Sequence, residues 1–310
     1  MPKTERMWAY LIHLSYNMWA DWKNPETKSP YNAAQPYLRC DESLWDDLMP
    51  RMRDAGINTV LVDVGDGVQF KSHPEIAVMR AWSWEKLQGK LEKIRALGME
   101  PLPKLNFSTC HDQWMGIYSR MVSTPQYYQV CKDVIAEVLA NWGKAPSHFH
   151  LGMDEELAIH QRSFEYVVVR QYGLWWRDFS FYCDQLPKNV RPWIWSDYIW
   201  DKLDDFVHNM PTTVLQSNWY YGAKFGPEIK EPKGYIDLEQ HGYDQVPTFS
   251  TWTTDVNAEN TVRFIKEHVG QERIKGFVET VWRPTLEETR DRHIAAIDQT
   301  GRARKLFESL

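Results

Sequence analysis

Cysteine is scarce in this chain, and its spacing excludes two kinds of stabilising site. The 310 residues include four cysteines, and no two of them form a C-x-x-C pair. Neither a zinc cluster nor a disulfide framework is therefore predicted. A reducing compartment fits this pattern best, and 43% hydrophobic residues are enough for a large core.

Excess positive charge, long apolar runs and nucleotide-binding motifs are also absent from the sequence. The net charge is −6 and no basic run stands out, which excludes a protein that tracks nucleic-acid phosphates. The opening residues MPKTERMWAY have no apolar signal-peptide core, and no stretch reaches the length of a membrane span. No G-x-G-x-x-G or G-x-x-x-x-G-K-[ST] follows a predicted strand, so we expect no cofactor. We expect a cytoplasmic protein, or an exported one whose signal peptide has been removed, with no nucleic-acid or membrane partner.

Tryptophan, by contrast, is abundant, with 16 in the chain. Any one of them can belong to a large aromatic core. An aromatic face at the end of a strand can instead stack on a sugar ring, whose C–H face is apolar while its rim carries hydroxyls. Carbohydrate is therefore the class of partner that we expect. Seven tryptophans stand beside polar residues at the ends of apolar segments: Trp19, Trp22, Trp114, Trp195, Trp219, Trp252 and Trp282.

Short apolar segments alternate with amphipathic ones along the whole chain. Such alternation, without a Pro/Gly/Ser-rich linker, predicts one α/β domain with a parallel sheet. Eight units in this length favour a single (β/α)₈ TIM barrel that spans residues 1–310. The predicted strands are 8–14, 58–64, 100–105, 149–153, 192–196, 213–216, 246–251 and 276–281, and helical patterns cover 43–56, 83–98, 127–143, 165–186 and 257–270.

The carboxyl ends of the strands are where a barrel of this kind carries its chemistry. They supply carboxylates, histidines and tryptophans, but no serine or cysteine in a triad pattern. A metal site of His150, Asp154 and His160 has too loose a spacing, so no metal is predicted. The side chains at the strand ends are His13, Asn17, Asp63, Asp66, Asn106, His111, Asp154, Glu155, Asp197, Trp219, Trp252, Asp255, Glu279 and Trp282.

Three consecutive acids, Asp154, Glu155 and Glu156, follow the fourth predicted strand. We assign Glu156 to the first turn of a following helix, where acids are favoured by the helix dipole. Asp154 and Glu155 come directly after an apolar run that should be buried. Carboxylates at the rim of an aromatic pocket have raised or split pKa values, which glycoside cleavage requires.

The residues 150–155 read HLGMDE and match H-x-G-x-D-E, the signature of the family 20 glycoside hydrolases, the β-N-acetylhexosaminidases. The resemblance covers about residues 40 to 285. The segment 57–76 is similar to that family's second strand and following loop, and 82–111 to its helix into the third strand. WIWSD, LQSNW and the tryptophan of GFVETVW resemble its strands five, six and eight.

The resemblance implies a retaining, substrate-assisted mechanism. Glu155 would protonate the leaving oxygen and later activate water, while Asp154 would orient the substrate's 2-acetamido group, whose carbonyl oxygen is the nucleophile. Three tryptophans would enclose the acetamide and His111 would steer Glu155. Together with the other strand-end residues, we expect substrate contacts from His13, Asn106, His111, Trp195, Asp197, Trp219, Trp252, Glu279 and Trp282.

Four departures from the family pattern keep other functions open. The first strand ends at His13 where the family has a sugar-binding arginine, and Asn106 replaces an aspartate. Arg283-Pro284 replaces a glutamate after the eighth strand, and the Tyr-x-Asp after strand seven is not evident in STWTTDV. One alternative is a retaining or inverting two-carboxylate glycosidase acting on a non-acetamido sugar, with Glu155 as acid and Glu279 or Asp197 as partner. The other is a carbohydrate-binding barrel without catalysis.

Overall fold

The computed structural model describes residues 6–23 and 29–310, and its described part is an α/β barrel. Eight parallel strands form one sheet in the order β6-β5-β4-β3-β2-β1-β8-β7. The predicted (β/α)₈ barrel is therefore confirmed, with every predicted strand present. The strands are β1 (Met7–His13), β2 (Thr59–Asp63), β3 (Glu100–Lys104), β4 (His148–His150), β5 (Arg191–Trp195), β6 (Leu215–Ser217), β7 (Thr248–Phe249) and β8 (Gly276–Thr280).

The two ends of the sheet, β6 and β7, meet through backbone hydrogen bonds that close the barrel. Val246 N–H donates to Gln216 O at 2.8 Å, and Thr248 N–H donates to Asn218 O at 2.9 Å. Regular pairing elsewhere is parallel; Ala9 lies opposite Thr59 on one side and Val278 on the other. Closure brings the carboxyl ends of all eight strands to one rim.

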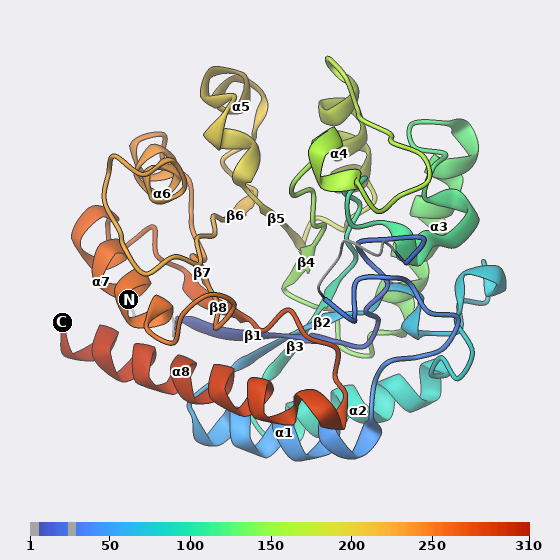
Figure 1. Cartoon of the computed structure of the whole chain (residues 1–310), viewed down its shortest axis with the longest axis horizontal. Coiled ribbons are helices and arrows are strands. Elements are labelled where there is room, and N and C mark those ends of the chain that lie inside the picture. The colour runs from blue at the N-terminus through green and yellow to red at the C-terminus, as the bar shows by residue number, and fades with distance from the viewer. Residues whose placement is uncertain (1–5, 24–28) are drawn as a thin grey trace.

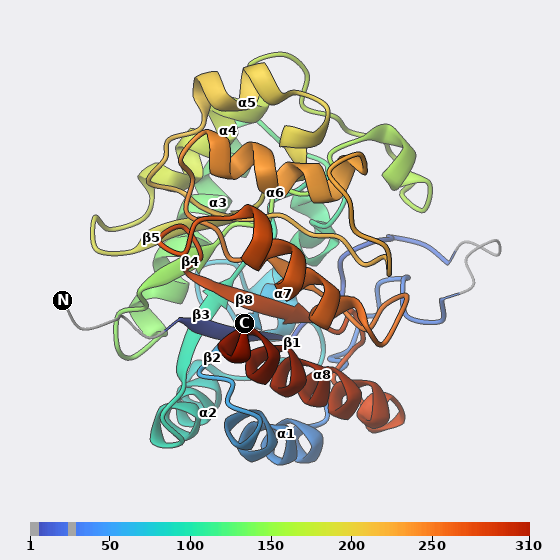
Figure 2. The ribbon, with the colours of Figure 1, turned by 90° about the vertical axis from the view of Figure 1, so that its left-hand side faces the viewer.

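An α-helix follows each strand in the described part of the chain. Figures 1 and 2 show these helices around the outside of the strands, with α1 and α8 side by side along one flank. None of the helices within the described ranges is both long and apolar enough to span a bilayer. The helices are α1 (Glu42–Asp54), α2 (Trp84–Ala96), α3 (Pro125–Asn141), α4 (Leu174–Asp184), α5 (Leu203–Asn209), α6 (Lys230–Gln240), α7 (Asn257–His268) and α8 (Arg290–Ser309).

Side chains alternate between the barrel interior and the helical layer along each strand, as a pleated strand requires. Tyr10, Val60 and Ile194 belong to the cluster that packs between the strands and α1 to α5. The alternation fixes which strand-end residues can point toward the barrel axis. The interior cluster contains Ala9, Leu11, Leu61, Leu102, Trp193, Trp195, Leu215, Val246 and Val278.

Three helices, α5, α6 and α8, were not among the predicted helical patterns. In α6, Pro232 and Gly234 weaken the helical signal, but glycine relieves a tight contact there, because a Cβ at position 234 would lie 3.0 Å from Trp200 Nε1. Helix α8 is long but mostly polar, so its periodicity is weak. Helix α4 begins at Leu174, not at residue 165, because residues 162–173 form a loop that carries the buried Arg170.

Candidate active site

The segment after β4 makes a strained turn that places two carboxylates at the rim of the barrel. Gly152 has φ +75°, and a Cβ there would lie 2.8 Å from the Cα of Asn106, so only glycine fits. Met153 and Glu155 also have positive φ, 76° and 55°. Residues other than glycine keep such a conformation only where their surroundings hold them in it, and such residues cluster at functional sites.

Asp154 and Glu155 share one imidazole. The Nε2 atom of His111 lies 3.3 Å from Asp154 Oδ2 and 3.2 Å from Glu155 Oε2. Burial opposes protonation of His111, but the charge of Asp154 and the contacts with both carboxylates raise its pKa to about 10. Burial likewise opposes ionisation of Asp154, but His111 and an Asn106 Nδ2 hydrogen bond of 2.9 Å lower its pKa to about 2. The site therefore holds an imidazolium beside an ionised Asp154 at neutral pH.

Glu156 has a structural contact in place of a helix. Its carboxylate contacts the guanidinium of Arg170, which is 0% exposed at its side chain, and accepts from Thr109 N–H at 2.8 Å. Only a short 3₁₀ turn, Ala158–Gln161, follows, so the interpretation of Glu156 as a first-turn helix residue is wrong. The Glu156–Arg170 ion pair instead stabilises the loop after β4 that carries Asp154 and Glu155.

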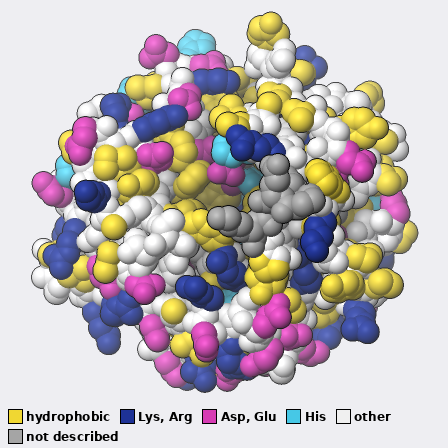
Figure 3. Space-filling view, viewed as in Figure 1, with side chains coloured by type: hydrophobic (Ala, Val, Ile, Leu, Met, Phe, Trp, Pro, Cys, Tyr) yellow, Lys and Arg dark blue, Asp and Glu magenta, His cyan; other side chains and the backbone are white. Residues whose placement is uncertain are grey.

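A cavity of ≈ 660 Å³ opens at the carboxyl ends of the strands. Figure 3 shows this hollow near the middle of the face, where acidic and histidine side chains lie beside hydrophobic ones. Its size suits one or two sugar rings. The cavity is lined by Trp19, Asn32, His111, Asp154, Glu155, Ile159, His160, Arg162, Ser163, Trp195, Trp219, Tyr221, Trp252 and Trp282.

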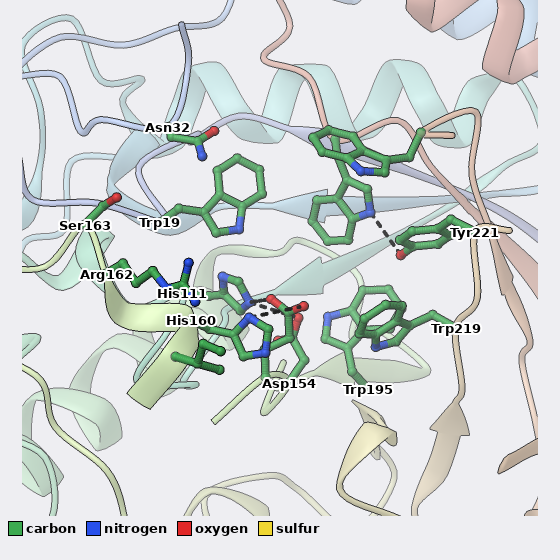
Figure 4. Close-up of a pocket in the computed structure, with 14 residues that line it drawn as sticks. Trp19, Asn32, His111, Asp154, His160, Arg162, Ser163, Trp195, Trp219 and Tyr221 are labelled. Carbon is green, nitrogen blue, oxygen red and sulfur yellow. Dashed lines mark hydrogen bonds and ion pairs between the residues drawn. The ribbon is translucent and has the colours of Figure 1, made fainter. Parts of the chain in front are cut away.

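Four aromatic residues form the wall that faces the carboxylates; Figure 4 shows Trp195, Trp219 and Tyr221 across the cavity from Asp154. The Tyr221 ring stacks on Trp219 with centroids 5.3 Å apart, and Trp195 lies 6.1 Å from Trp282. The Tyr221 hydroxyl accepts from Trp282 Nε1 at 3.0 Å. Its own proton is therefore left to donate to a ligand. We call Trp195, Trp219, Tyr221 and Trp282 the aromatic box.

Tyr221 was not predicted from the sequence. It comes from the loop after β6, two residues beyond Trp219, and the sequence WYYG there was its only signal. The loop after β1 supplies Trp19, one of the seven tryptophans singled out in the sequence, and Asn32, which was not predicted. The loop after β4 supplies Ile159, His160, Arg162 and Ser163, which were also not predicted as contacts.

Trp252 lies at the mouth of the cavity and is 45% exposed. The guanidinium of Arg283 lies 4.6 Å from the centre of its ring. Arg283 also donates to Trp282 O at 2.8 Å. The cation over one face of the ring holds Trp252 in place at the cavity mouth.

Two predicted contact residues lie directly behind the cavity lining. Asn106 supports Asp154 through the hydrogen bond given above. Asp197 accepts the backbone N–H of Glu155 at 2.8 Å and the indole N–H of Trp219 at 3.4 Å. Both residues therefore touch cavity residues without lining the cavity themselves.

The other two predicted contact residues, His13 and Glu279, are fully buried and do not line the cavity, although the His13 ring lies 5.6 Å from that of the lining residue Trp282. His13 Nδ1 lies 3.2 Å from Asp63 Oδ2, which also contacts Lys104 Nζ at 2.6 Å. Glu279 is 0% exposed, and on β8 it is out of phase with the inward-facing Val278. It accepts from Thr251 N–H at 3.3 Å, and burial raises its pKa well above the ordinary value.

His150 is packed inside the barrel, with ring centroids 4.9 Å from Trp193 and 4.3 Å from Trp195. Burial lowers its pKa well below the ordinary value, so the ring is neutral. Among the residues that the structure describes, no group of three His, Cys, Asp or Glu is placed to hold a metal ion.

No protein-family model and no curated protein matches this sequence. Solved structures do match its fold. The Vibrio harveyi GH20 exo-β-N-acetylglucosaminidase, in complex with N-acetylglucosamine, aligns with a TM-score of 0.62 and 12% identity over 95% of this chain and 54% of that one. The Bacteroides fragilis β-N-acetylhexosaminidase aligns with a TM-score of 0.63 and 11% identity, over 95% of this chain and 65% of that one. Dispersin B aligns with a TM-score of 0.57 and 12% identity, over 97% of this chain and 99% of that one. The chain thus spans about half of the Vibrio protein and nearly all of Dispersin B, and it shares the barrel fold of the GH20 hexosaminidases.

Proposed function

We propose that this protein is a diverged family 20 glycoside hydrolase that removes a terminal β-linked N-acetylhexosamine by retaining, substrate-assisted catalysis. The observation that carries the proposal is the pairing of adjacent Asp154 and Glu155 with an aromatic box on the opposite wall. A planar acetamide fits between aromatic faces, and its two polar atoms find an acceptor in Asp154 and a donor in Tyr221. Structural neighbours that bind N-acetylglucosamine support a carbohydrate substrate.

The reaction needs one proton donor and one orienting carboxylate. Glu155 gives its proton to the glycosidic oxygen as the bond from the anomeric carbon breaks. The acetamide carbonyl oxygen attacks that carbon and forms an oxazolinium ring. Asp154 accepts the acetamide N–H and balances the positive charge on the ring, while Glu155, now ionised, takes a proton from the water that opens it.

The two-carboxylate alternative lacks an opposing acid. A retaining enzyme of that kind has two carboxyl groups about 5 Å apart across the sugar ring. Within the described lining of the cavity the carboxylates are Asp154 and Glu155, which are neighbours on one loop. Glu279 is buried away from the cavity and Asp197 is bonded to the Glu155 backbone. The substrate itself is therefore the better source of the nucleophile.

A direct test compares aryl N-acetyl-β-glucosaminide with aryl β-glucoside. Hydrolysis of the first alone, with retention of anomeric configuration and inhibition by a thiazoline analogue of the oxazolinium ring, is the expected result. Hydrolysis of the glucoside at a similar rate would favour the two-carboxylate mechanism. Binding of the sugar without turnover would favour the non-catalytic carbohydrate-binding barrel.

A further inference from the structure

Glu155, the proposed general acid, depends on an unusual backbone conformation for the direction of its side chain. Its φ of 55° places Glu155 in the left-handed region, and Gly152 and Met153 in the same turn also have positive φ values. A glutamate leaves this region unless contacts hold it there. The carbonyl oxygen of Glu155 accepts from Leu157 N–H at 2.6 Å and from Cys110 Sγ at 2.7 Å.

The backbone N–H of Glu155 donates a hydrogen bond to a side chain that follows the next strand, β5. Its acceptor is Asp197 Oδ2, at 2.8 Å, in the first turn after β5. The other oxygen of the same carboxylate accepts from Trp219 Nε1 at 3.4 Å. One side chain thus joins the general-acid loop after β4 to the aromatic box after β6.

We propose that Asp197 is a positioning residue that aims the Glu155 side chain at the glycosidic oxygen by holding its backbone N–H. The role rests on the proposed function, and it replaces the substrate contact expected from the sequence. Both oxygens of Asp197 face protein donors, and the residue lies outside the cavity lining, so it is not placed to accept from a sugar hydroxyl.

The same contacts fix the distance between the proton donor and the acetamide pocket. The donor must reach the oxygen on the anomeric carbon while the box holds the group on the adjacent carbon. Small displacements of reacting groups have large effects on rate, about 10²-fold for 1 Å. The 2.8 Å hydrogen bond to Glu155 N–H is therefore a direct means of control over the reaction, and the longer 3.4 Å contact with Trp219 is secondary to it.

The charge state of Asp197 determines which substitution is conservative. Burial and the charge of Asp154 raise the pKa of Asp197 to about 8. The raised pKa favours the protonated acid, which still offers a carbonyl oxygen to Glu155 N–H. Asparagine keeps the shape and one acceptor oxygen for Glu155 N–H but loses the acceptor for Trp219 Nε1, whereas alanine has neither acceptor.

The test uses three variants of the full chain, D197A, D197N and the neighbouring control S196A. Ser196 is buried and its hydroxyl has no hydrogen-bond partner among the described residues, so S196A removes nothing from the loop contacts. In D197A we expect kcat on a substrate with a poor leaving group to fall about 10- to 100-fold, with a smaller loss on an activated aryl substrate. D197N and S196A should stay within about threefold of wild type on both substrates, because each keeps the acceptor for Glu155 N–H.

Crystal structures of the variants give a readout that does not depend on activity. Glu155 should leave the left-handed region in D197A and keep it in D197N and S196A. If D197A does not fold, D197E, which moves the acceptor by one methylene, should show the same leaving-group-dependent loss and the same shift of Glu155. Glu155 unchanged in D197A or D197E, or losses equal for both leaving groups, would overturn the inference. A wild-type enzyme inert on every N-acetylglucosaminide would refute the proposed function, while the crystal structures would still decide the role of Asp197.

Discussion

Substitution of Asp154 by asparagine is the most informative perturbation of this site. Asp154 is 6% exposed, accepts from Asn106 Nδ2, and lies 3.3 Å from His111. Asparagine preserves the size of the side chain and one acceptor oxygen, so the loop should keep its path. What is lost is a negative charge that the low pKa of Asp154 maintains at every working pH.

The size of the effect follows from the charge that the reaction creates. A full charge 4 Å away at an effective dielectric constant of 20 contributes about 4 kcal/mol. Loss of a single preorganised electrostatic group in an enzyme typically costs about 10²–10³ in kcat. We therefore expect kcat for Asp154→Asn to fall by about 10²–10³, with KM changed little, because the charge acts mainly in the transition state.

The assay is steady-state hydrolysis of an aryl N-acetyl-β-glucosaminide, with and without azide. Glu279→Gln is the matched control, since Glu279 is a buried acid near the end of another barrel strand, β8, and burial raises its pKa well above the ordinary value. The control should retain wild-type kcat. Full activity in Asp154→Asn would remove the orienting role, and rescue by azide with inverted configuration would show that Asp154 is a covalent nucleophile.

Three further outcomes follow from the same geometry. Glu155→Gln should lower kcat by about 10²–10⁴ on a poor leaving group but less on an activated aryl group, and equal losses in the two assays would contradict the general-acid role. Tyr221→Phe keeps the stacking on Trp219 but removes the hydroxyl donor, so kcat should fall about 10²-fold while KM for an N-acetyl substrate rises little; an unchanged kcat would exclude Tyr221 from the reaction. The His111 pKa, raised from 6.5 to about 10, gives a stabilising contribution that is complete below pH 6.5 and disappears as pH rises toward 10. Thermal unfolding should therefore show a fall in Tm over this range that is reduced in His111→Gln, and parallel curves for the two proteins would refute the ion pair.

The strands were predictable because each one is short, apolar and followed by a polar turn. The helical layer was less predictable, because a helix that packs through small residues has a weak apolar period. Gly234 in α6 fits against Trp200, and Gly301 in α8 lies with its Cβ position 3.3 Å from Ala55 O. Glycine allows close packing at both positions, and it lowers the helical signal in the sequence.

The chemistry of the site was predictable where it depends on local sequence. The six residues 150–155 predict both the turn at Gly152 and the two carboxylates, Asp154 and Glu155, that it positions. Orientation was less predictable: Glu279 is one residue out of phase with Val278 and so points away from the barrel axis. The position of Tyr221 in the cavity wall was also not predictable, because the path of the loop after β6 depends on tertiary packing, which leaves no periodic pattern in the sequence.

The departures from the family pattern lie at several strand ends around the site. His13, at the strand end where a sugar-binding arginine is expected, is buried with Asp63 and Lys104, and so cannot hold a sugar hydroxyl. Asn106 keeps its neighbour Asp154 oriented, and Tyr221 brings a hydroxyl to the aromatic box from the loop after β6. Under the proposed function, the contacts to the acetamide and to the leaving oxygen are therefore complete, and recognition of the remaining hydroxyls passes to the long loops after β1 and β4. Those loops supply Trp19, Asn32, Arg162 and Ser163 to the cavity, and differences in them should set which terminal sugar the enzyme accepts.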